Sequence, residues 1–246
     1  MLLLLPPSET KRPGGGGGLR LASLRFPELA DARRAVLRAT RELAADGDAA
    51  VAALKLGRTR YAEVAKNRVL ETSGVLPAAD RYIGVLYGAL DAATLPDSAR
   101  ARLGRHVVIQ SALFGPVGAL DGIPDYRLSH DSRLPGLRLK EVWAQPVAAV
   151  LASRRGLIVD ARSRSYAELG PIPDRDDAVV LDVVSEDAAS RRRALNHFNK
   201  HAKGELARAF ALAGVDPQTP AEFVEWGDSA GFRLELDGRR LTLVTH

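Results

Sequence analysis

The sequence predicts an α/β protein of the mixed α+β kind, in which a mixed β-sheet is covered by helices. Short apolar runs rich in Val, Ile and Leu alternate along the chain with longer segments of helical periodicity. The last segment, FRLELDGRRLTLVTH, instead alternates apolar and polar residues around Asp237-Gly238, as antiparallel hairpins do. Helices between strands favour parallel pairing, and the terminal hairpin makes the sheet mixed.

The chain opens with a predicted strand. Residues 2–5 are four leucines ended by Pro6 and Pro7, and this run is too short for a helix but suits a buried strand. The five glycines at 14–18 predict a flexible loop after it. The polar residues between these two segments then follow the end of a strand.

A group of helices is predicted next. Apolar residues recur at helical spacing over 28–46, and further helices are expected over 47–55 and 59–71, with a tight turn at Gly57 between them. We therefore predict a helical subdomain over 28–75. A length of 246 residues suits one large domain or two small ones, and we expect this subdomain to lie within a single domain of residues 1–246.

The second half of the chain contains the remaining strands. Apolar runs at 106–110, 156–160 and 178–184 are rich in Val and Ile and are bounded by Gly or polar residues, which predicts buried strands. A helix is expected over 139–153, between two of these runs. Another is expected from about 187 to 213, before the terminal hairpin.

Composition excludes several classes of chemistry. The chain has no cysteine, so disulfides, thiolate metal sites and thiol peroxidase chemistry are excluded. No apolar run is long enough to span a membrane, and the leading leucines are too short for a signal peptide, so we expect a cytoplasmic protein with no membrane partner. The net charge of +5 favours an anionic partner.

The segment RRRALNHFNKHAKGELARAF, residues 191–210, carries the densest positive charge. Between residues 188 and 210, six lysines and arginines stand against one acid, and Lys200 and Lys203 fall on one face of the predicted helix. This face is either a phosphate or nucleic-acid contact surface, or a solvated surface whose Gly204 packs against the sheet. His197 and His201 have the spacing of metal ligands, but the segment lacks the glutamate of H-E-x-x-H, so we expect no metal.

The segment SALFGPVGALDGIPDYRLS, residues 111–129, is predicted to be a long ordered loop after a strand. It contains neither G-x-G-x-x-G nor a P-loop motif, so we expect no nucleotide cofactor and no other cofactor. Tyr126 beside Arg127 could bind a planar or anionic ligand. Alternatively, the segment is a structural Ω-loop with the tyrosine in the core.

Two further segments place polar groups at turns. RYIGVLYGALD contains Tyr82, and VDARSRSYAEL places Arg162, Ser163 and Tyr166 after a predicted strand. No Ser-His-Asp order or close carboxylate pair accompanies them, so no known catalytic motif is present. In the helical region, ALKLGRTRYAEVAKNR places Gly57 between two helices with Arg58 and Arg60 after it, as in helix-hairpin-helix modules that hold a backbone phosphate.

Five of these segments together resemble the YaaA-like proteins, a family named for resistance to peroxide stress. The resemblance covers nearly the whole chain and rests on LLLLPPSETK, RYIGVLYGALD, SALFGPVGALDGIPDYRLS, VDARSRSYAEL and NHFNKHAKGELAR. It implies an α/β fold with a helix-hairpin-helix-like element, binding of duplex DNA without sequence specificity, and indirect protection against peroxide and iron damage. The family pattern also places a lysine near the end of the first strand, and Lys11 stands there in this chain.

Two hypotheses follow. In the first, a monomer binds double-stranded DNA through phosphate contacts from Gly57, Arg58, Arg60, Arg193, Asn199, Lys200 and Lys203. In the second, the chain is an enzyme acting on a nucleobase-like or other anionic small molecule. Its pocket would contain Ser8, Lys11, Tyr82, Tyr126, Arg127, Arg162, Ser163 and Tyr166, with Lys203 beside them. A convex basic face would favour the first hypothesis, and a deep pocket the second.

Overall fold

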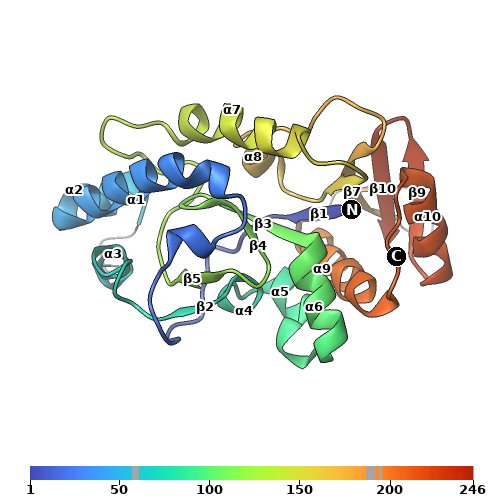
Figure 1. Cartoon of the computed structure of the whole chain (residues 1–246), viewed down its shortest axis with the longest axis horizontal. Helices are drawn as coiled ribbons and strands as arrows, with labels where there is room; N and C mark the ends of the chain where they lie inside the picture. The colour runs from blue at the N-terminus through green and yellow to red at the C-terminus, as the bar shows by residue number, and fades with distance from the viewer. Residues whose placement is uncertain (57–60, 187–191, 194–195, 246) are drawn as a thin grey trace.

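A mixed sheet with the strand order β4-β3-β1-β6-β7-β10-β9 forms the centre of the computed structural model (Figure 1). The structure describes residues 1–56, 61–186, 192–193 and 196–245. The strands of the sheet are β1 (Leu2–Leu5), β3 (Val107–Ser111), β4 (Gly115–Gly118), β6 (Ile158–Asp160), β7 (Ala178–Glu186), β9 (Arg233–Asp237) and β10 (Arg240–Thr245). The short strand β8 (Arg192–Arg193) pairs with the end of β7, and β2 (Val75–Pro77) pairs with β5 (Gly122–Pro124) in a separate sheet.

The first strand lies inside the sheet rather than at its edge. β1 pairs in parallel with β3 on one side and with β6 on the other, and all four of its leucines are buried. β6, β7 and β10 continue the parallel pairing, while β4 and β9 close the two ends in antiparallel fashion. These pairings confirm the predicted mixed sheet, and the run of leucines is uninterrupted because both faces of β1 are covered.

Helices cover both faces of the sheet. In Figure 1, α7 and α8 lie above the central strands, while α5, α6 and α9 lie below them. The helices along the chain are α1 (Ala30–Ala45), α2 (Gly47–Ala53), α3 (Tyr61–Arg68), α4 (Ala78–Arg81), α5 (Val85–Leu90), α6 (Asp97–His106), α7 (Leu139–Ala152), α8 (Arg164–Ala167), α9 (Asn196–Ala213) and α10 (Pro220–Ser229). Within the described part of the chain, no helix is both long and apolar enough to cross a lipid bilayer.

The predicted start of the helix that carries Lys200 and Lys203 is wrong. The helix expected from about 187 begins instead at Asn196, because Arg192 and Arg193 pair with Glu186 and Ser185 as strand β8. Arg193 is therefore not on the helix that carries Lys200 and Lys203. The helices α1 to α3 fall within the predicted 28–75 subdomain, which stays a prediction together with the single domain of residues 1–246.

The segment 111–129 is not one continuous loop, because it contains β4 and β5. The glycines and proline of β4 are typical of a loop. They are tolerated because β4 is an edge strand, which forms backbone hydrogen bonds to a neighbouring strand on one side only.

The glycine-rich segment is held in place rather than flexible. Gly16 and Val75 exchange backbone hydrogen bonds of 3.1 and 3.2 Å. At Gly15 a Cβ atom would lie 2.4 Å from the carbonyl oxygen of Val75, so only glycine allows this approach. The buried Arg81 guanidinium donates to the carbonyl oxygens of Arg12 and Gly14. The chain after β1 is thereby fixed to β2 through Val75 and to the end of α4 through Arg81.

Candidate functional site

A cavity of about 490 Å³ lies where the chain leaves the carboxyl ends of β1 and β6. Four segments contribute to it: the loop after β1, the start of α5, the chain after β6, and one face of α9. Its lining residues are Pro6, Pro7, Ser8, Glu9, Thr10, Gly84, Val85, Leu86, Tyr87, Ser163, Tyr166, Asn199, Lys200 and Lys203.

The topology of the sheet explains this position. The chain leaves β1 toward β3 on one side, whereas it leaves β6 toward β7 on the other. Two neighbouring parallel strands whose connections diverge leave a crevice outside their carboxyl ends, and ligand sites of α/β proteins form there. The loop after β1 and the turn after β6 are the two walls of this crevice.

Helix α9 brings two lysines to the cavity. Gly204 lets the helix approach α5 closely, since a Cβ atom there would lie 2.2 Å from the carbonyl oxygen of Leu86. Gly204 therefore packs closely, as in one of the two alternatives for this segment, but against α5 and not against the sheet. Lys203, the residue before Gly204, is only 7% exposed, whereas Lys200, one turn earlier, is exposed at the rim. The same helix therefore packs through one face and presents ammonium groups with another.

Lys203 differs from an ordinary surface lysine. Within the described residues its ammonium group has no hydrogen bond or ion pair. Burial lowers the pKa of Lys203, and the attraction of Asp160 and Asp182 opposes this without cancelling it. A buried amine without a partner favours losing its proton or gaining an anionic ligand.

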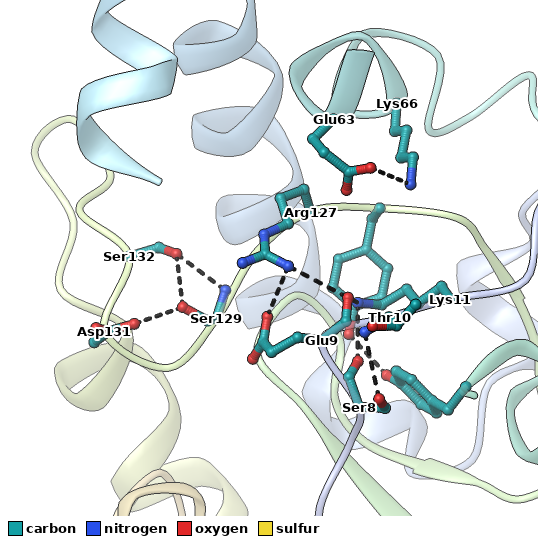
Figure 2. Close-up of polar contacts among 12 residues, drawn as sticks. Ser8, Glu9, Thr10, Lys11, Glu63, Lys66, Arg127, Ser129, Asp131 and Ser132 are labelled. Carbon is teal, nitrogen blue, oxygen red and sulfur yellow. Dashed lines mark hydrogen bonds and ion pairs between the residues drawn. The ribbon is translucent and has the colours of Figure 1, made fainter. Parts of the chain in front are cut away.

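The loop after β1 is tied to the surrounding elements by side chains that the sequence analysis noticed only in part. Tyr87 donates to the carbonyl oxygen of Pro6 at 2.7 Å, and Tyr166 donates to the Glu9 carboxylate at 3.1 Å. Figure 2 shows Arg127 beside Glu9, where it lies 3.4 Å from both the carbonyl oxygen and a carboxylate oxygen. Glu9 therefore joins the loop to two other segments.

Lys11 lies behind this loop and does not line the cavity. Its ammonium group donates to the carbonyl oxygens of Ser8 at 3.2 Å and Glu9 at 3.3 Å (Figure 2). It also lies 4.1 Å from the centre of the Tyr126 ring, a cation–π arrangement. Burial lowers the pKa of Lys11 to about 8, despite the attraction of Glu9 and Asp125. Its contacts are those of a residue that shapes the loop.

The tyrosines beneath Lys11 form a hydrogen-bonded chain. The hydroxyls of Tyr82 and Tyr126 lie 2.7 Å apart, and that of Tyr126 lies 2.8 Å from Ser111. Burial raises the pKa of both phenols, so both stay neutral at physiological pH. Tyr126 is 1% exposed, which agrees with the alternative that placed this tyrosine in the core.

Arg162 also lies outside the cavity. It binds the Asp160 carboxylate through two contacts of 2.7 Å and donates to the Gln110 side chain at 2.9 Å. All of these groups are buried. The neighbouring Ser163 lines the cavity instead. Of these two adjacent residues, Arg162 therefore has a structural role and Ser163 belongs to the site.

The remaining predicted site residues are distributed as follows. Ser8, Ser163, Tyr166, Asn199, Lys200 and Lys203 come together in the cavity. Arg193 lies in β8, and Gly57, Arg58 and Arg60 lie outside the described residues. Glu9, Thr10 and Tyr87 also line the cavity, although the sequence patterns did not predict them as site residues. These residues lie in LLLLPPSETK and RYIGVLYGALD, the same segments as the predicted residues Ser8, Lys11 and Tyr82, and this proximity could have indicated them.

A second basic feature is an open groove on α1 and α3. It has a volume of about 640 Å³ and is lined by Arg38, Arg41, Glu42, Ala45 and Arg68. Arg41 pairs with Glu71 at 2.5 Å, whereas the Arg38 side chain has no hydrogen bond or ion pair to any described residue. The groove adjoins the helices that flank residues 57–60.

Comparison with known proteins shows similarity along nearly the whole chain. A family model described as peroxide stress protein YaaA matches residues 1–237. A UPF0246 protein of Corynebacterium efficiens is 42% identical over 251 residues, 99% of each chain. One of Streptomyces coelicolor is 41% identical over 242 residues, 96% of this chain and 93% of that protein. The region matched by the family model includes every segment that lines the cavity.

Proposed function

Because the chain belongs to the peroxide stress protein YaaA family, we propose that it serves this stress response by binding a small anionic molecule in the cavity between β1 and β6. One observation carries the proposal. Two lysines, Lys200 and Lys203, line a cavity at the diverging ends of parallel strands, and neither ammonium group has a protein partner among the described residues.

Charge balance defines the ligand class. Ammonium groups without carboxylate partners are stabilised by an anion. Among the described residues that line the cavity, the one carboxylate is that of Glu9, which already interacts with Tyr166 and Arg127. Pro6, Val85 and Leu86 contribute apolar surface to the same cavity. The cavity therefore suits a molecule with a carboxylate or phosphate at one end and an apolar or planar body at the other.

Anion binding to the two lysines can be tested directly. Isothermal titration with inorganic pyrophosphate and with 2-oxoglutarate as probes should show saturable binding to at least one of them. Changing both Lys200 and Lys203 to Gln should weaken that binding at least tenfold, about 1.4 kcal/mol. Lys140→Gln is the matched control, because Lys140 is a surface lysine paired with Glu168. Binding of neither probe, or equal binding by the double variant, would refute the proposal.

Binding of duplex DNA is a second candidate function, and the arginine groove favours it. Arg38, Arg41 and Arg68 are all exposed to an approaching polyanion, whereas Lys203 is buried against the cavity. Arginines on an open surface contact phosphates without reading base sequence. In this proposal, protection against peroxide and iron damage is indirect and comes from covering DNA.

The DNA proposal makes a separate measurable prediction. Fluorescence anisotropy with a short labelled duplex should give an affinity that falls steeply with salt. The double change Arg38→Ala and Arg68→Ala should reduce the magnitude of the salt slope by about one to two. The double change Lys200→Ala and Lys203→Ala serves as the comparison. If only the lysine pair alters the slope, α9 is the contact surface and the groove is not.

A further inference from the structure

We propose that Lys203 is an amine nucleophile that forms an imine with a carbonyl compound carrying an acidic group, such as a 2-oxo acid. This inference rests on the proposed anion-binding function and names the chemistry of that same site. It starts from the placement of two lysines one helical turn apart, one at the rim of the cavity and one inside it.

The surroundings of Lys203 distinguish it from the other buried cations. Buried Arg33 donates to the carbonyl oxygens of Phe114 and Pro116, and Lys11 donates to two carbonyl oxygens of its own loop. These contacts fix a charged group in place. Lys203 has no such donor contact within the described residues, so its nitrogen is free to approach a bound molecule.

The protonation state of Lys203 also favours imine formation. Imine formation needs the neutral amine, and exposed lysines are almost entirely protonated near neutral pH. Burial lowers the pKa of Lys203, which increases the neutral fraction at any pH below its ordinary value. Lys200 lies exposed at the rim of the same cavity, where it can hold the acidic group while Lys203 attacks.

The bond changes balance without a further reactant. The Lys203 nitrogen forms a bond to the carbonyl carbon, and the carbonyl oxygen leaves as water with the two hydrogens of the amine. Nothing is oxidised or reduced. Ser163 lines the same cavity with a hydroxyl that has no hydrogen bond among the described residues, so it is placed to relay a proton in the dehydration.

Reductive trapping tests this proposal on the unmodified protein. Incubation with glyoxylate and sodium cyanoborohydride near neutral pH converts an imine into a stable carboxymethyl amine, which peptide mass spectrometry can locate. The chain has only six lysines, so every one can be followed. We expect Lys203 to be modified at least tenfold faster than the exposed Lys200 and Lys140. Equal rates at all exposed lysines with an unmodified Lys203 would overturn the inference.

A second arm tests the role of Lys200. Lys200→Gln should slow the trapping of glyoxylate at Lys203, yet leave the trapping of acetaldehyde unchanged, because acetaldehyde has no carboxylate. Equal slowing of both aldehydes would overturn the assigned role. If pyrophosphate or 2-oxoglutarate still binds in the titration while Lys203 stays unmodified, the anion site stands and the imine chemistry fails. If neither binding nor trapping is seen, both proposals fail.

Discussion

Buried cations in this chain are distinguished by what surrounds them. The guanidinium groups of Arg33 and Arg81 each donate to several backbone carbonyl oxygens, and Lys11 donates to two. Carbonyl oxygens carry partial negative charge, so these cations are partly compensated and connect loops to the core. Lys203 makes no such contact to any residue that the structure describes, and it lines a cavity. A buried lysine thus stabilises a loop at Lys11, whereas at Lys203 it is available to a ligand.

Lys11 should make the stability of the protein depend on pH. Its pKa falls from 10.5 in the unfolded chain to about 8 in the folded protein, so the unfolded state binds more protons between these values. Unfolding free energy therefore rises with pH in that window. Relative to Lys11→Met, the wild type should gain about 2 kcal/mol between about pH 7.5 and about pH 9.5, as urea unfolding would measure.

The comparison with the Met variant isolates Lys11 from other groups. Buried Tyr82 and Tyr126 have raised pKa values, so the unfolded state releases their protons first and stability falls above about pH 10. Both proteins share that loss. A constant stability difference across the window would show that Lys11 keeps its ordinary pKa in the folded state.

At the scale of elements, the packing of α9 on α5 determines where the site lysines lie. Gly204 is the contact point, and the segments on either side of it serve the cavity: Lys200 and Lys203 from α9, and Val85 to Tyr87 from α5. A larger residue at this point would push the two helices apart. The geometry of the site therefore depends on a residue that does not line it.

Gly204→Ala should destabilise the protein by about 2 kcal/mol, because the new Cβ atom would overlap the Leu86 carbonyl oxygen, a backbone atom that cannot move alone. Gly88→Ala in α5 is the matched control. Nothing lies within 4 Å of its new Cβ atom, and alanine favours helix by up to about 1 kcal/mol over glycine. Chemical denaturation compares the two. Similar effects from both changes would contradict close packing at Gly204.

The elements show which parts of the fold the sequence could predict. The strands β1, β3 and β6 are short runs that are buried throughout, and β7 begins with an apolar run of the same kind, so their existence is evident from the local sequence. β4 reads GPVG, and its pairing to β3 depends on tertiary contacts that no local pattern encodes. The start of α9 was missed for the same reason, since β8 exists only through its pairing with β7.

The site was predictable to a similar extent. Ser8 and Ser163 follow predicted strands, so the edge where they meet could be expected. The sequence could not show that Tyr126 and Arg162 turn inward while Tyr87 reaches the cavity, because each of these segments places polar residues on both sides of its backbone. Side-chain direction is set by packing, and the residue order alone leaves it open.

At the scale of the whole molecule, β1 connects the two halves of the sheet. β3 and β4 lie on one side of it, and β6, β7, β10 and β9 lie on the other. Among the described strands, the two halves of the sheet are therefore hydrogen-bonded to each other only through β1. Its leucines are between 0% and 6% exposed. Loss of β1 pairing would separate the halves and open the cavity, whose first wall is the loop that follows this strand.

Hydrogen exchange should therefore identify β1 as a part of the molecule that opens only on global unfolding. The free energy of exchange for the Leu2–Leu5 amides should match the unfolding free energy from denaturation, whereas the edge strand β9 should exchange at a lower free energy. Exchange of β1 at the same low free energy as β9 would contradict the central role of β1.

The central position of β1 in the sheet also delays its pairing during translation. The strand is translated about a hundred residues before β3 and about 150 before β6, its two partners. At roughly 5–20 residues per second, about 5 to 20 s pass before the edge that faces β3 can be paired, and about 8 to 30 s pass before the edge that faces β6 can be paired. During that interval a four-leucine segment is exposed to chaperones and to other nascent chains, so the yield of native protein in a cell depends on translation speed as well as on the stability of the finished fold.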